Sequence, residues 1–388
     1  MPHSSRRNFL LAGLVAPAAA SAARPFADDR RPAPPPLPLF APGLRYRALG
    51  QTGLKVTSVG FGCMITSDAS VIERAADIGI TYFDTARGYQ SGNNERMVGA
   101  ALKGKRHKIT LSSKSAAHTR EAALADLDTS LRELGTDHLD VWYLHAKEKP
   151  SDVTDELIDA QQTAKKAGKI RFAGVSSHKG QAELIPALIA NPHIDVILTA
   201  YNFSMGQTLD PVIAAAHAAG KGVVAMKVMA GGFRNTKPGE KLYGTFQKDG
   251  ALLAALRWVL KSSDIDTTIP SMTDMDQLDE NLKAMTGGFT TSDDGLLARQ
   301  LERIAPFYCR MCGQCDGSCA KGLPVADMLR FLTYADGYGQ FSLGRERFLE
   351  LPPQLAQVRC DSCGACTVSC PHGVRVSARL QRAQELFA

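Results

Sequence analysis

Apolar runs and amphipathic stretches alternate along the chain between residues 44 and 288. The runs are rich in β-branched and aromatic residues, as buried strands are, and the stretches between them have apolar residues at helical spacing. The predicted strands lie at 56–63, 82–84, 109–112, 139–145, 171–175, 196–201, 223–228 and 267–269. Eight strands that alternate with helices over about 245 residues predict a (β/α)8 TIM barrel of the α/β class.

Turn and cap residues support this order of elements. Residues 45–56 predict a hairpin that turns at Gln51-Thr52-Gly53, ahead of the barrel. Glycines follow most of the helical patterns, where C-caps favour them. The helices are predicted at 69–78, 120–134 and 152–167, and the glycines are Gly79, Gly135, Gly168 and Gly220.

Composition limits the function more than the fold. Of the 388 residues, 44% are hydrophobic, which is ample for a core, and 45 basic against 39 acidic residues give a net charge of +6. This charge is mild, and no run of five like charges occurs. The sequence therefore gives no indication of nucleic-acid binding.

The first 23 residues predict an export signal. Ser5-Arg6-Arg7-Asn8-Phe9-Leu10 opens an apolar run that is too short to span a bilayer, so we expect no transmembrane segment in the mature chain. Two arginines before Phe-Leu are typical of a signal for the twin-arginine translocase, and Ala20-Ser21-Ala22 is a candidate cleavage site. This predicts a periplasmic protein; the alternative is a disordered basic start. Residues 24–43 are rich in proline and predict an extended linker.

Four polar side chains follow or end the second, third and fourth predicted strands. They are Asp84, Tyr89, Lys114 and His145. Because the carboxyl ends of parallel strands meet at one mouth of a barrel, we expect these side chains to lie together. In the alternative interpretation Asp84 caps a helix and Tyr89 packs on a rim.

These four residue types suit carbonyl reduction or its reverse. A hydride that reaches a carbonyl carbon makes an alkoxide, and Tyr89 can supply the proton. A Lys114 ammonium beside it is expected to lower the pKa of the phenol, with Asp84 holding that ammonium. His145 can donate a hydrogen bond to the carbonyl oxygen as charge develops there.

Ordered motifs from residue 45 to 286 carry a resemblance to a known family. They include Arg47-Ala48-Leu49-Gly50-Gln51-Thr52-Gly53, Asp84 to Tyr89 followed by Asn94-Glu95, Gly168-Lys169-Ile170-Arg171 leading to Gly174-Val175-Ser176, and Ile269-Pro270-Ser271 with Glu280-Asn281. With these motifs the chain resembles the aldo-keto reductase superfamily. The resemblance implies an oxidoreductase that interconverts a small carbonyl and an alcohol, with Asp84, Tyr89, Lys114 and His145 as its catalytic tetrad.

The resemblance also implies a nicotinamide dinucleotide, NAD or NADP, but the cofactor positions depart from the family pattern. The usual Ser-Asn pair after the fifth strand is Ser176-Ser177, the glutamine of the sixth strand is Leu198, and the stacking aromatic is Met226. The basic residues that clamp a 2′-phosphate fall on Ser271 and Gln277, and an anion site without Lys or Arg is poor. The candidate cofactor residues are Ser176, Ser177, Lys227, Ser271, Glu280 and Asn281, and candidate pocket residues are Met64, Arg87, Tyr201, Phe203 and Phe233.

Eight of the nine cysteines lie in two runs with the same C-x2-C-x2-C-x3-C spacing. They are Cys309, Cys312, Cys315 and Cys319, and then Cys360, Cys363, Cys366 and Cys370. Zinc ligation and disulfides are alternatives for cysteines in an exported protein, although zinc rarely uses this spacing. The ninth, Cys63, is expected in the core.

The two runs look like a bacterial-type two-cluster ferredoxin module, which implies two [4Fe–4S] clusters in a small, mainly helical domain at 289–388. The resemblance pairs three cysteines of each run with the fourth of the other. One set is then Cys309, Cys312, Cys315 and Cys370, and the other is Cys360, Cys363, Cys366 and Cys319. Helices are predicted at 323–334 and 375–387.

Two functions of different class follow. In the first, the barrel is an enzyme on a small carbonyl or alcohol, and the clusters exchange electrons with a partner protein. In the second, the chain is an electron-transfer protein whose barrel is a non-catalytic docking scaffold. The intact tetrad favours the first, and the altered nicotinamide contacts favour the second.

Overall fold

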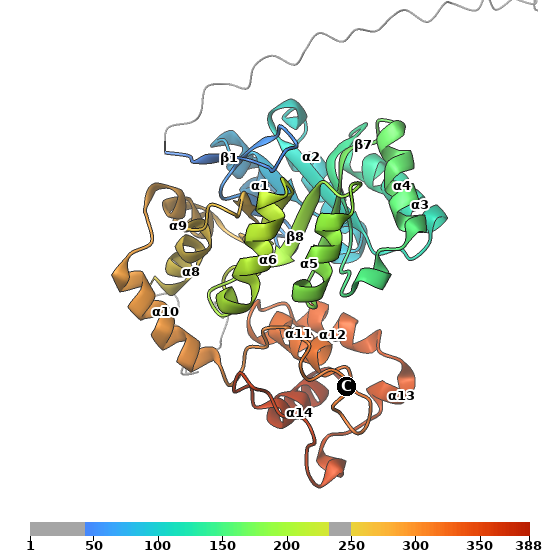
Figure 1. Cartoon of the computed structure of the whole chain (residues 1–388), viewed down its shortest axis with the longest axis vertical. Helices are drawn as coiled ribbons and strands as arrows, with labels where there is room; N and C mark the ends of the chain where they lie inside the picture. The colour runs from blue at the N-terminus through green and yellow to red at the C-terminus, as the bar shows by residue number, and fades with distance from the viewer. Residues whose placement is uncertain (1–42, 233–249) are drawn as a thin grey trace, which may run out of the picture. The chain divides into compact units, whose positions relative to one another are not determined.

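The computed structural model describes residues 43–232 and 250–388. The predicted signal, nearly all of the predicted linker and the candidate pocket residue Phe233 lie outside the described residues. The described residues belong to one compact unit, which contains both the barrel and the cysteine-rich region (Figure 1).

Eight parallel strands form the barrel in the described residues, each paired with its sequence neighbours. They are β3 (Phe61–Gly62), β4 (Tyr82–Asp84), β5 (Thr110–Ser115), β6 (Leu139–Leu144), β7 (Ile170–Ser177), β8 (Val196–Ala200), β9 (Gly222–Met226) and β10 (Thr267–Thr268). Parallel bridges from Val59 to Thr268 and from Gly62 to Ser271 join the last strand to the first. The predicted (β/α)8 barrel is therefore confirmed.

The first predicted strand, 56–63, is wrong in its extent. Val56 belongs to β2 (Lys55–Thr57), which pairs antiparallel with β1 (Tyr46–Ala48) as the predicted hairpin. Only Phe61 and Gly62 form β3. The chain must leave the hairpin and enter the barrel within a few residues, so it makes isolated bridges to β10 instead of a continuous ladder.

Helices surround the strands, as Figure 1 shows for α3 to α6. The barrel helices are α1 (Ala69–Asp77), α2 (Asn93–Ala101), α3 (Arg120–Leu134), α4 (Asp155–Lys166), α5 (Gln181–Ala190), α6 (Gly206–Ala218), α8 (Ala251–Leu260) and α9 (Met275–Thr286). Side-chain caps begin several of them: Thr119 accepts from the Ala122 amide and Thr154 from the Leu157 amide. Gly135 has φ 64°, as the predicted C-cap requires.

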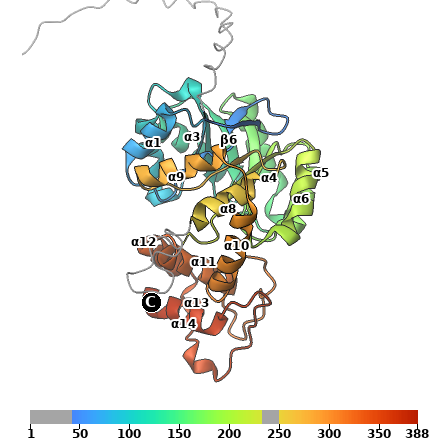
Figure 2. The same ribbon diagram turned by 90° about the vertical axis from the view of Figure 1, so that its left-hand side faces the viewer.

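The cysteine-rich region is mainly helical, as predicted (Figure 2). Its helices are α10 (Thr291–Ile304), α11 (Val325–Asp336), α12 (Phe341–Leu349), α13 (Pro353–Ala356) and α14 (Val376–Phe387). The predicted helices correspond to α11 and α14, whereas α12 and α13 were not predicted. The last four of these helices share a small core that includes Leu332, Phe348 and Phe387, and cysteines of both runs pack against it. We call residues 305–388 the C-terminal module.

Polar contacts join the C-terminal module to the loops at the carboxyl ends of the barrel strands. Asn202 donates from Nδ2 to the Tyr308 hydroxyl at 3.0 Å. The Lys179 ammonium lies 3.5 Å from a carboxylate oxygen of both Asp316 and Asp327. The module therefore faces the end of the barrel where the tetrad is expected.

Backbones meet closely where α11 ends against the loop after β9. A Cβ on Gly337 would lie 2.1 Å from the carbonyl oxygen of Gly231, which is rigid backbone. We therefore expect Gly337→Ala to force the module and the loop apart and to lower the unfolding temperature, at a cost of about 1–3 kcal/mol. Thermal unfolding of the cluster-loaded protein measures this.

Gly295→Ala is the matched control for that substitution. Its Cβ would meet only the Arg299 guanidinium, at 3.7 Å, within the middle of α10. Alanine should therefore stabilise the helix by up to about 1 kcal/mol. Equal unfolding temperatures for the two variants would contradict the close approach at Gly337.

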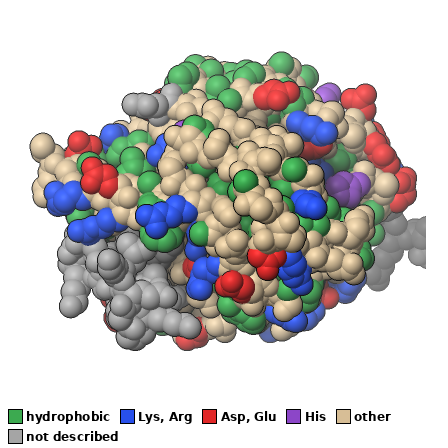
Figure 3. Space-filling model, turned by 90° about the horizontal axis from the view of Figure 1, so that it is seen from below, with side chains coloured by type: hydrophobic (Ala, Val, Ile, Leu, Met, Phe, Trp, Pro, Cys, Tyr) green, Lys and Arg blue, Asp and Glu red, His purple; other side chains and the backbone are tan. Residues whose placement is uncertain are grey.

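The face of the molecule seen from below in Figure 1 carries charges of both signs. Figure 3 shows Lys and Arg side chains scattered among acidic, apolar and other groups, without one broad area of a single sign. Within the described residues, no helix is both long and apolar enough to cross a membrane.

Candidate active site

The side chains of Asp84, Tyr89, Lys114 and His145 meet at the carboxyl ends of β4, β5 and β6. The Lys114 ammonium donates to Asp84 Oδ2 at 2.5 Å and to the Thr85 carbonyl at 2.7 Å. It also lies 3.5 Å from the Tyr89 hydroxyl, and the Tyr89 and His145 rings are edge to face with centroids 5.9 Å apart. The structure thus brings together all four side chains that the sequence singled out.

The Asp84–Lys114 ion pair is buried and well supplied with hydrogen bonds. The Ser112 hydroxyl donates to Asp84 Oδ1 at 2.7 Å, so both carboxylate oxygens have a partner. Burial raises the pKa of Asp84 and lowers the pKa of Lys114, and the charge of each residue opposes the shift in the other. The pair can keep an ammonium in place beneath the phenol.

The pKa of Tyr89 differs from the sequence expectation. It is raised well above 10, first by burial and then by the negative charge of Asp84, with a smaller contribution from Tyr334. The expected lowering of this pKa by a cation is therefore wrong, because burial outweighs it. A phenol at this place stays protonated over the ordinary pH range and can donate its proton.

His145 is placed to act as a neutral hydrogen-bond donor. Burial lowers its pKa well below the usual value, and the positive charges of Lys114 and Arg347 lower it further. A neutral imidazole has one N–H that can point at a carbonyl oxygen. The tetrad can therefore polarise a carbonyl and protonate its oxygen.

A buried polar layer fixes the loop that carries Tyr89. Tyr89 opens a 3-10 turn (Tyr89–Gly92) in which Gln90 and Ser91 have positive φ, 50° and 53°. Gln90 Nε2 donates to the Thr66 carbonyl at 2.8 Å, and Asn94 Nδ2 donates to the Cys63 carbonyl at 2.8 Å. These bonds hold a strained backbone next to the phenol.

Two candidate pocket residues, Arg87 and Tyr201, bind carboxylates of the barrel instead of lining the pocket. Arg87 pairs with the buried carboxylate of Glu95, which also accepts from the Ser113 hydroxyl at 2.6 Å. The Tyr201 hydroxyl donates to Asp210 at 2.6 Å. Neither Arg87 nor Tyr201 lines the cavity described next, contrary to expectation.

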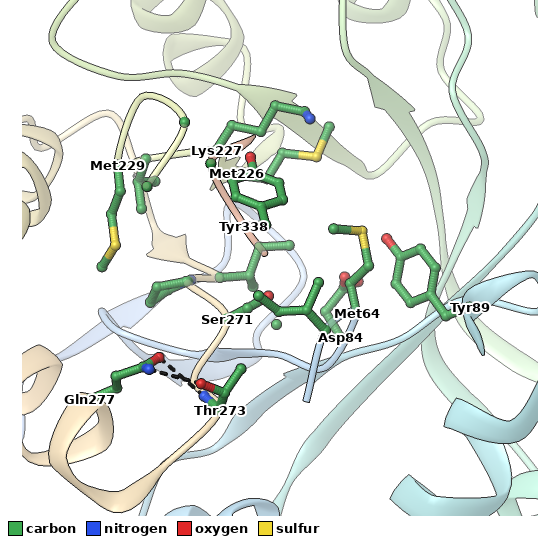
Figure 4. A pocket seen from close by; sticks show the side chains of 18 of the residues that line it. Met64, Asp84, Tyr89, Met226, Lys227, Met229, Ser271, Thr273, Gln277 and Tyr338 are labelled. Carbon is green, nitrogen blue, oxygen red and sulfur yellow. Dashed lines mark hydrogen bonds between the residues drawn. The ribbon is translucent and has the colours of Figure 1, made fainter. Parts of the chain in front are cut away.

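A cavity of about 910 Å³, open to solvent, lies beside the tetrad. Figure 4 shows the Tyr89 hydroxyl pointing toward it, with Met64 beside the phenol and Lys227 and Tyr338 across from it. The C-terminal module supplies part of the wall through Gly337 and Tyr338. The predicted residues that line the cavity are Met64, Asp84, Tyr89, Met226, Lys227, Ser271 and Gln277.

The predicted carboxamide pair does not line this cavity. The Ser176 hydroxyl accepts from the Ala146 amide at 2.9 Å, and the Ser177 hydroxyl donates to the Lys179 carbonyl at 2.7 Å. Both side chains are therefore engaged with backbone, and their role as cofactor contacts stays a prediction. Leu198 is fully buried in the barrel core.

The far end of the cofactor region lies on α9. Asn281 is 1% exposed, and neither atom of its amide has a partner among the described residues. Such an amide fits a polar group of a bound dinucleotide. Glu280 lies beside it on the helix and does not line the cavity.

The cysteines gather into two sets that mix the two runs. Burial raises the pKa of Cys309 and of Cys360; nearby Cys315, Cys312 and Cys370 raise that of Cys309 further, and nearby Cys319, Cys363, Cys366 and Asp361 raise that of Cys360. Hydrogen bonds tie the crossed ends together. Arg310 meets His372 at 3.2 Å, and the Thr367 hydroxyl donates to the Ser318 carbonyl at 2.8 Å.

None of these eight cysteines, nor buried Cys63, forms a disulfide. No three His, Cys, Asp or Glu side chains in residues 43–232 and 250–388 are close enough together to hold a single metal ion. The cysteine donor set and its crossed grouping fit iron–sulfur clusters.

Sequence reasoning missed several polar residues that surround the tetrad. They are His178 from the barrel and Arg330, Tyr334, Tyr338 and Arg347 from the C-terminal module. The available signal was the spacing by four of Arg330, Tyr334 and Tyr338, which places a polar and aromatic stripe along α11 and its end. That spacing does not say which surface the stripe contacts.

Comparison with protein families agrees with this geometry. Residues 66–297, more than half of the chain, match the model of the aldo/keto reductase family. The chain belongs to the aldo/keto reductase family. It is accordingly an oxidoreductase, and residues 308–375 match the 4Fe-4S dicluster domain, which supports iron–sulfur clusters in this aldo/keto reductase.

Individual relatives align with the barrel of this aldo/keto reductase. It is 34% identical over 155 residues to the uncharacterized oxidoreductase YqkF of Bacillus subtilis, covering 34% of this chain and 49%, about half, of that protein. It is 26% identical over 282 residues to L-galactose dehydrogenase of Arabidopsis thaliana, covering 63% and 88%. Among solved structures, aldo-keto reductase AKR11C1 from Bacillus halodurans (holo form) has 25% identity and a TM-score of 0.57, covering 66% and 96%.

Proposed function

We propose that the protein interconverts a small carbonyl and an alcohol with Tyr89 as the proton donor, and exchanges electrons with a partner protein through two [4Fe–4S] clusters. The observation that carries the proposal is the placement of the Tyr89 hydroxyl 3.5 Å from the buried Lys114 ammonium, beside His145 and an open cavity. Family membership supports the oxidoreductase chemistry.

Each tetrad residue has a role that follows from its contacts. His145, neutral because its pKa is lowered by burial, donates a hydrogen bond that orients the carbonyl oxygen. Tyr89 gives that oxygen its proton in reduction and takes it back in oxidation. Asp84 fixes Lys114, and the ammonium stabilises the phenolate that Tyr89 becomes.

A nicotinamide bound in the cavity would supply or accept the hydride. Met226, Ser271 and Gln277 would line its site, with Asn281 beyond them on α9. Among the described residues that line the cavity, Lys227 is the only Lys or Arg, so the usual clamp for a 2′-phosphate is missing. Gln277 is already bonded to Thr273 and Asp274.

We therefore expect NADH and NADPH to bind with affinities within about tenfold of each other. A charge-assisted hydrogen bond contributes about 1.5–3 kcal/mol, so the loss of two can erase most of the preference for the phosphorylated form. Titration of both forms, with mass spectrometry of small molecules released on denaturation, measures this. Strong selection for NADPH would contradict the expectation.

The decisive experiment for the function is turnover of a carbonyl panel by the cluster-loaded protein, with a reduced nicotinamide or a one-electron donor as reductant. Reduction of any member supports the proposal. An intact iron content with no nicotinamide binding and no turnover would favour the second function, an electron-transfer protein with a docking barrel.

Cluster assignment and location belong to the same proposal. Cys309, Cys312, Cys315 and Cys370 would hold one cluster, and Cys360, Cys363, Cys366 and Cys319 the other, which the crossed grouping of thiols supports.

The Arg6-Arg7 pair supports export to the periplasm by the twin-arginine translocase. Changing both arginines to lysine should leave the protein in the cytoplasm, and normal export of that variant would exclude this route.

A further inference from the structure

A buried histidine outside the tetrad faces the cavity without a partner. His178 follows β7 and is 8% exposed, and its Nδ1 has no hydrogen-bond partner in the described part of the chain. Its ring centroid lies 6.2 Å from that of His145. A buried, unpartnered ring nitrogen that lines a cavity indicates a ligand group at this point.

Lys227 lines the same cavity and has no acidic partner among the described residues. Its ammonium lies 5.2 Å from the ring centroid of Tyr334 and 6.0 Å from that of Tyr338, both in the C-terminal module. Its backbone has φ 56°, a left-handed conformation that is unusual for lysine. The turn after β9 therefore holds this cation against the module at a conformational cost.

Two arginines of the C-terminal module, Arg330 and Arg347, are each held by a carboxylate of the same module. Arg330 on α11 donates from Nη2 to Asp327 at 2.8 Å, while its buried Nε has no partner among the described residues. Arg347 on α12 donates from Nη1 to both oxygens of Glu350 at 2.9 Å. Its Nη2 would lie 3.8 Å from a Cβ on Gly88, the residue before Tyr89.

The cations around this point have carboxylate partners, Lys227 excepted, among the described residues. Lys227, Arg330 and Arg347 contribute three positive charges, against the carboxylates of Asp327 and Glu350. Asp327 is shared with Lys179, which also pairs with Glu148. Although burial raises the pKa of Tyr334, the positive charges of Lys227, Arg330 and Arg347 lower it overall. Lys227, the cation with no carboxylate partner in the described part of the chain, carries one charge, which matches one carboxylate better than a doubly charged phosphate.

We propose that His178, Lys227 and Arg330, with Arg347 at the edge, bind a carboxylate of the substrate. The reacting carbonyl or hydroxyl would lie at Tyr89 and His145, and the carboxylate would lie on the side of His178. The substrate is then a small hydroxy acid or oxo acid, sugar acids included. This inference rests on the proposed function for the reacting end of the substrate, and it makes the C-terminal module part of the substrate site.

Calorimetric titration of the full-length, cluster-loaded protein tests the charge requirement without turnover. Two pairs of probes differ in charge and little else: lactate with lactamide, and gluconate with gluconamide. Loss of a charge-assisted bond should weaken binding by about 10–100-fold in at least one pair. Equal affinities within both pairs, or no binding of either carboxylate, overturn the proposal.

Variants locate the site. Lys227→Gln removes a cation that has no acidic partner in the described chain, and should lower carboxylate affinity about tenfold without changing amide affinity. Arg330→Gln should do the same, although it also breaks the pair with Asp327. Arg347→Gln, at the edge of the site, should also lower carboxylate affinity. Arg345→Gln is its matched control, because Arg345 is exposed on the same helix. It should leave every affinity unchanged.

The same titrations distinguish a substrate carboxylate from a dinucleotide phosphate as the bound anion. They also distinguish failure of this site from failure of the proposed enzyme function. If ADP-ribose binding falls in Lys227→Gln and Arg330→Gln while the carboxylate-to-amide ratio stays constant, the cations serve a dinucleotide phosphate and the substrate assignment is wrong. Charge-selective binding with no turnover of any carbonyl supports this site while defeating the proposed enzyme. Turnover with no charge selectivity does the reverse.

Discussion

Tyr89→Phe is expected to lower turnover by about 10²–10⁴-fold while leaving the protein folded. The substitution removes the proton donor but keeps the ring that packs edge to face with His145. Among the described residues the hydroxyl makes one long contact, to Lys114 at 3.5 Å, so little stability is lost. Steady-state kinetics with any accepted carbonyl measures the effect.

Tyr201→Phe is the control for that substitution. Tyr201 is also a buried tyrosine near the barrel mouth, but its hydroxyl donates to Asp210 and does not line the cavity. Its loss should leave turnover unchanged. A variant Tyr89→Phe that retained the rate of the parent would rule out the phenol as the acid.

The raised pKa of Tyr89 adds a pH signature. Reduction needs the protonated phenol, and the protonated form is lost only as pH rises through a pKa above 10. The rate of reduction should therefore show no falling limb from Tyr89 below about pH 10.

Cys370→Ala is expected to remove about half of the iron, from about eight to about four atoms per chain, because one four-iron cluster loses a ligand. The informative measurement is the iron content of double variants. If Cys370 belongs with Cys309, then Cys370→Ala combined with Cys309→Ala should lose no more iron than either alone. Combined with Cys360→Ala, it should lose both clusters.

The opposite pattern would assign each fourth cysteine to its own run. In that case the pair Cys370→Ala and Cys360→Ala would retain about four iron atoms per chain. Cys319→Ala repeats the test from the other side, since it should add nothing to Cys360→Ala. Two zinc ions in place of iron would refute the cluster assignment altogether.

The position of the tetrad was predictable because it depends only on strand order. Asp84, Lys114 and His145 end neighbouring parallel strands, and parallel strands end at one mouth. The direction of the Ser176 and Ser177 hydroxyls was not predictable, since a serine gives no sign of whether backbone or solvent will take its hydrogen bond. Both hydroxyls bond to the nearby backbone here.

The raised pKa of Tyr89 and the positions of the nearby cations could not be predicted from local sequence patterns, for a different reason. They depend on the docking of α11 and α12, whose residues lie far along the chain from the barrel strands. The apolar face of α11 predicts a core contact, but its polar stripe is compatible with solvent or with any concave surface. Only the three-dimensional packing shows that Tyr334 lies over Lys227.

The packing of cysteines against the core that includes α11 has a consequence for regulation by metal supply. Cys309, Cys319 and Cys360 contact the same apolar core as Leu332, and α11 also brings Arg330 close to His145 and the Tyr334 ring close to Lys227 of the barrel. Cluster assembly contributes folding free energy to such a module, because the ligands are brought together only in the folded state. If Arg330 binds the substrate as proposed, linkage requires that iron and substrate raise each other's apparent affinity. In that case a shortage of iron would leave the tetrad intact and lower the affinity for substrate.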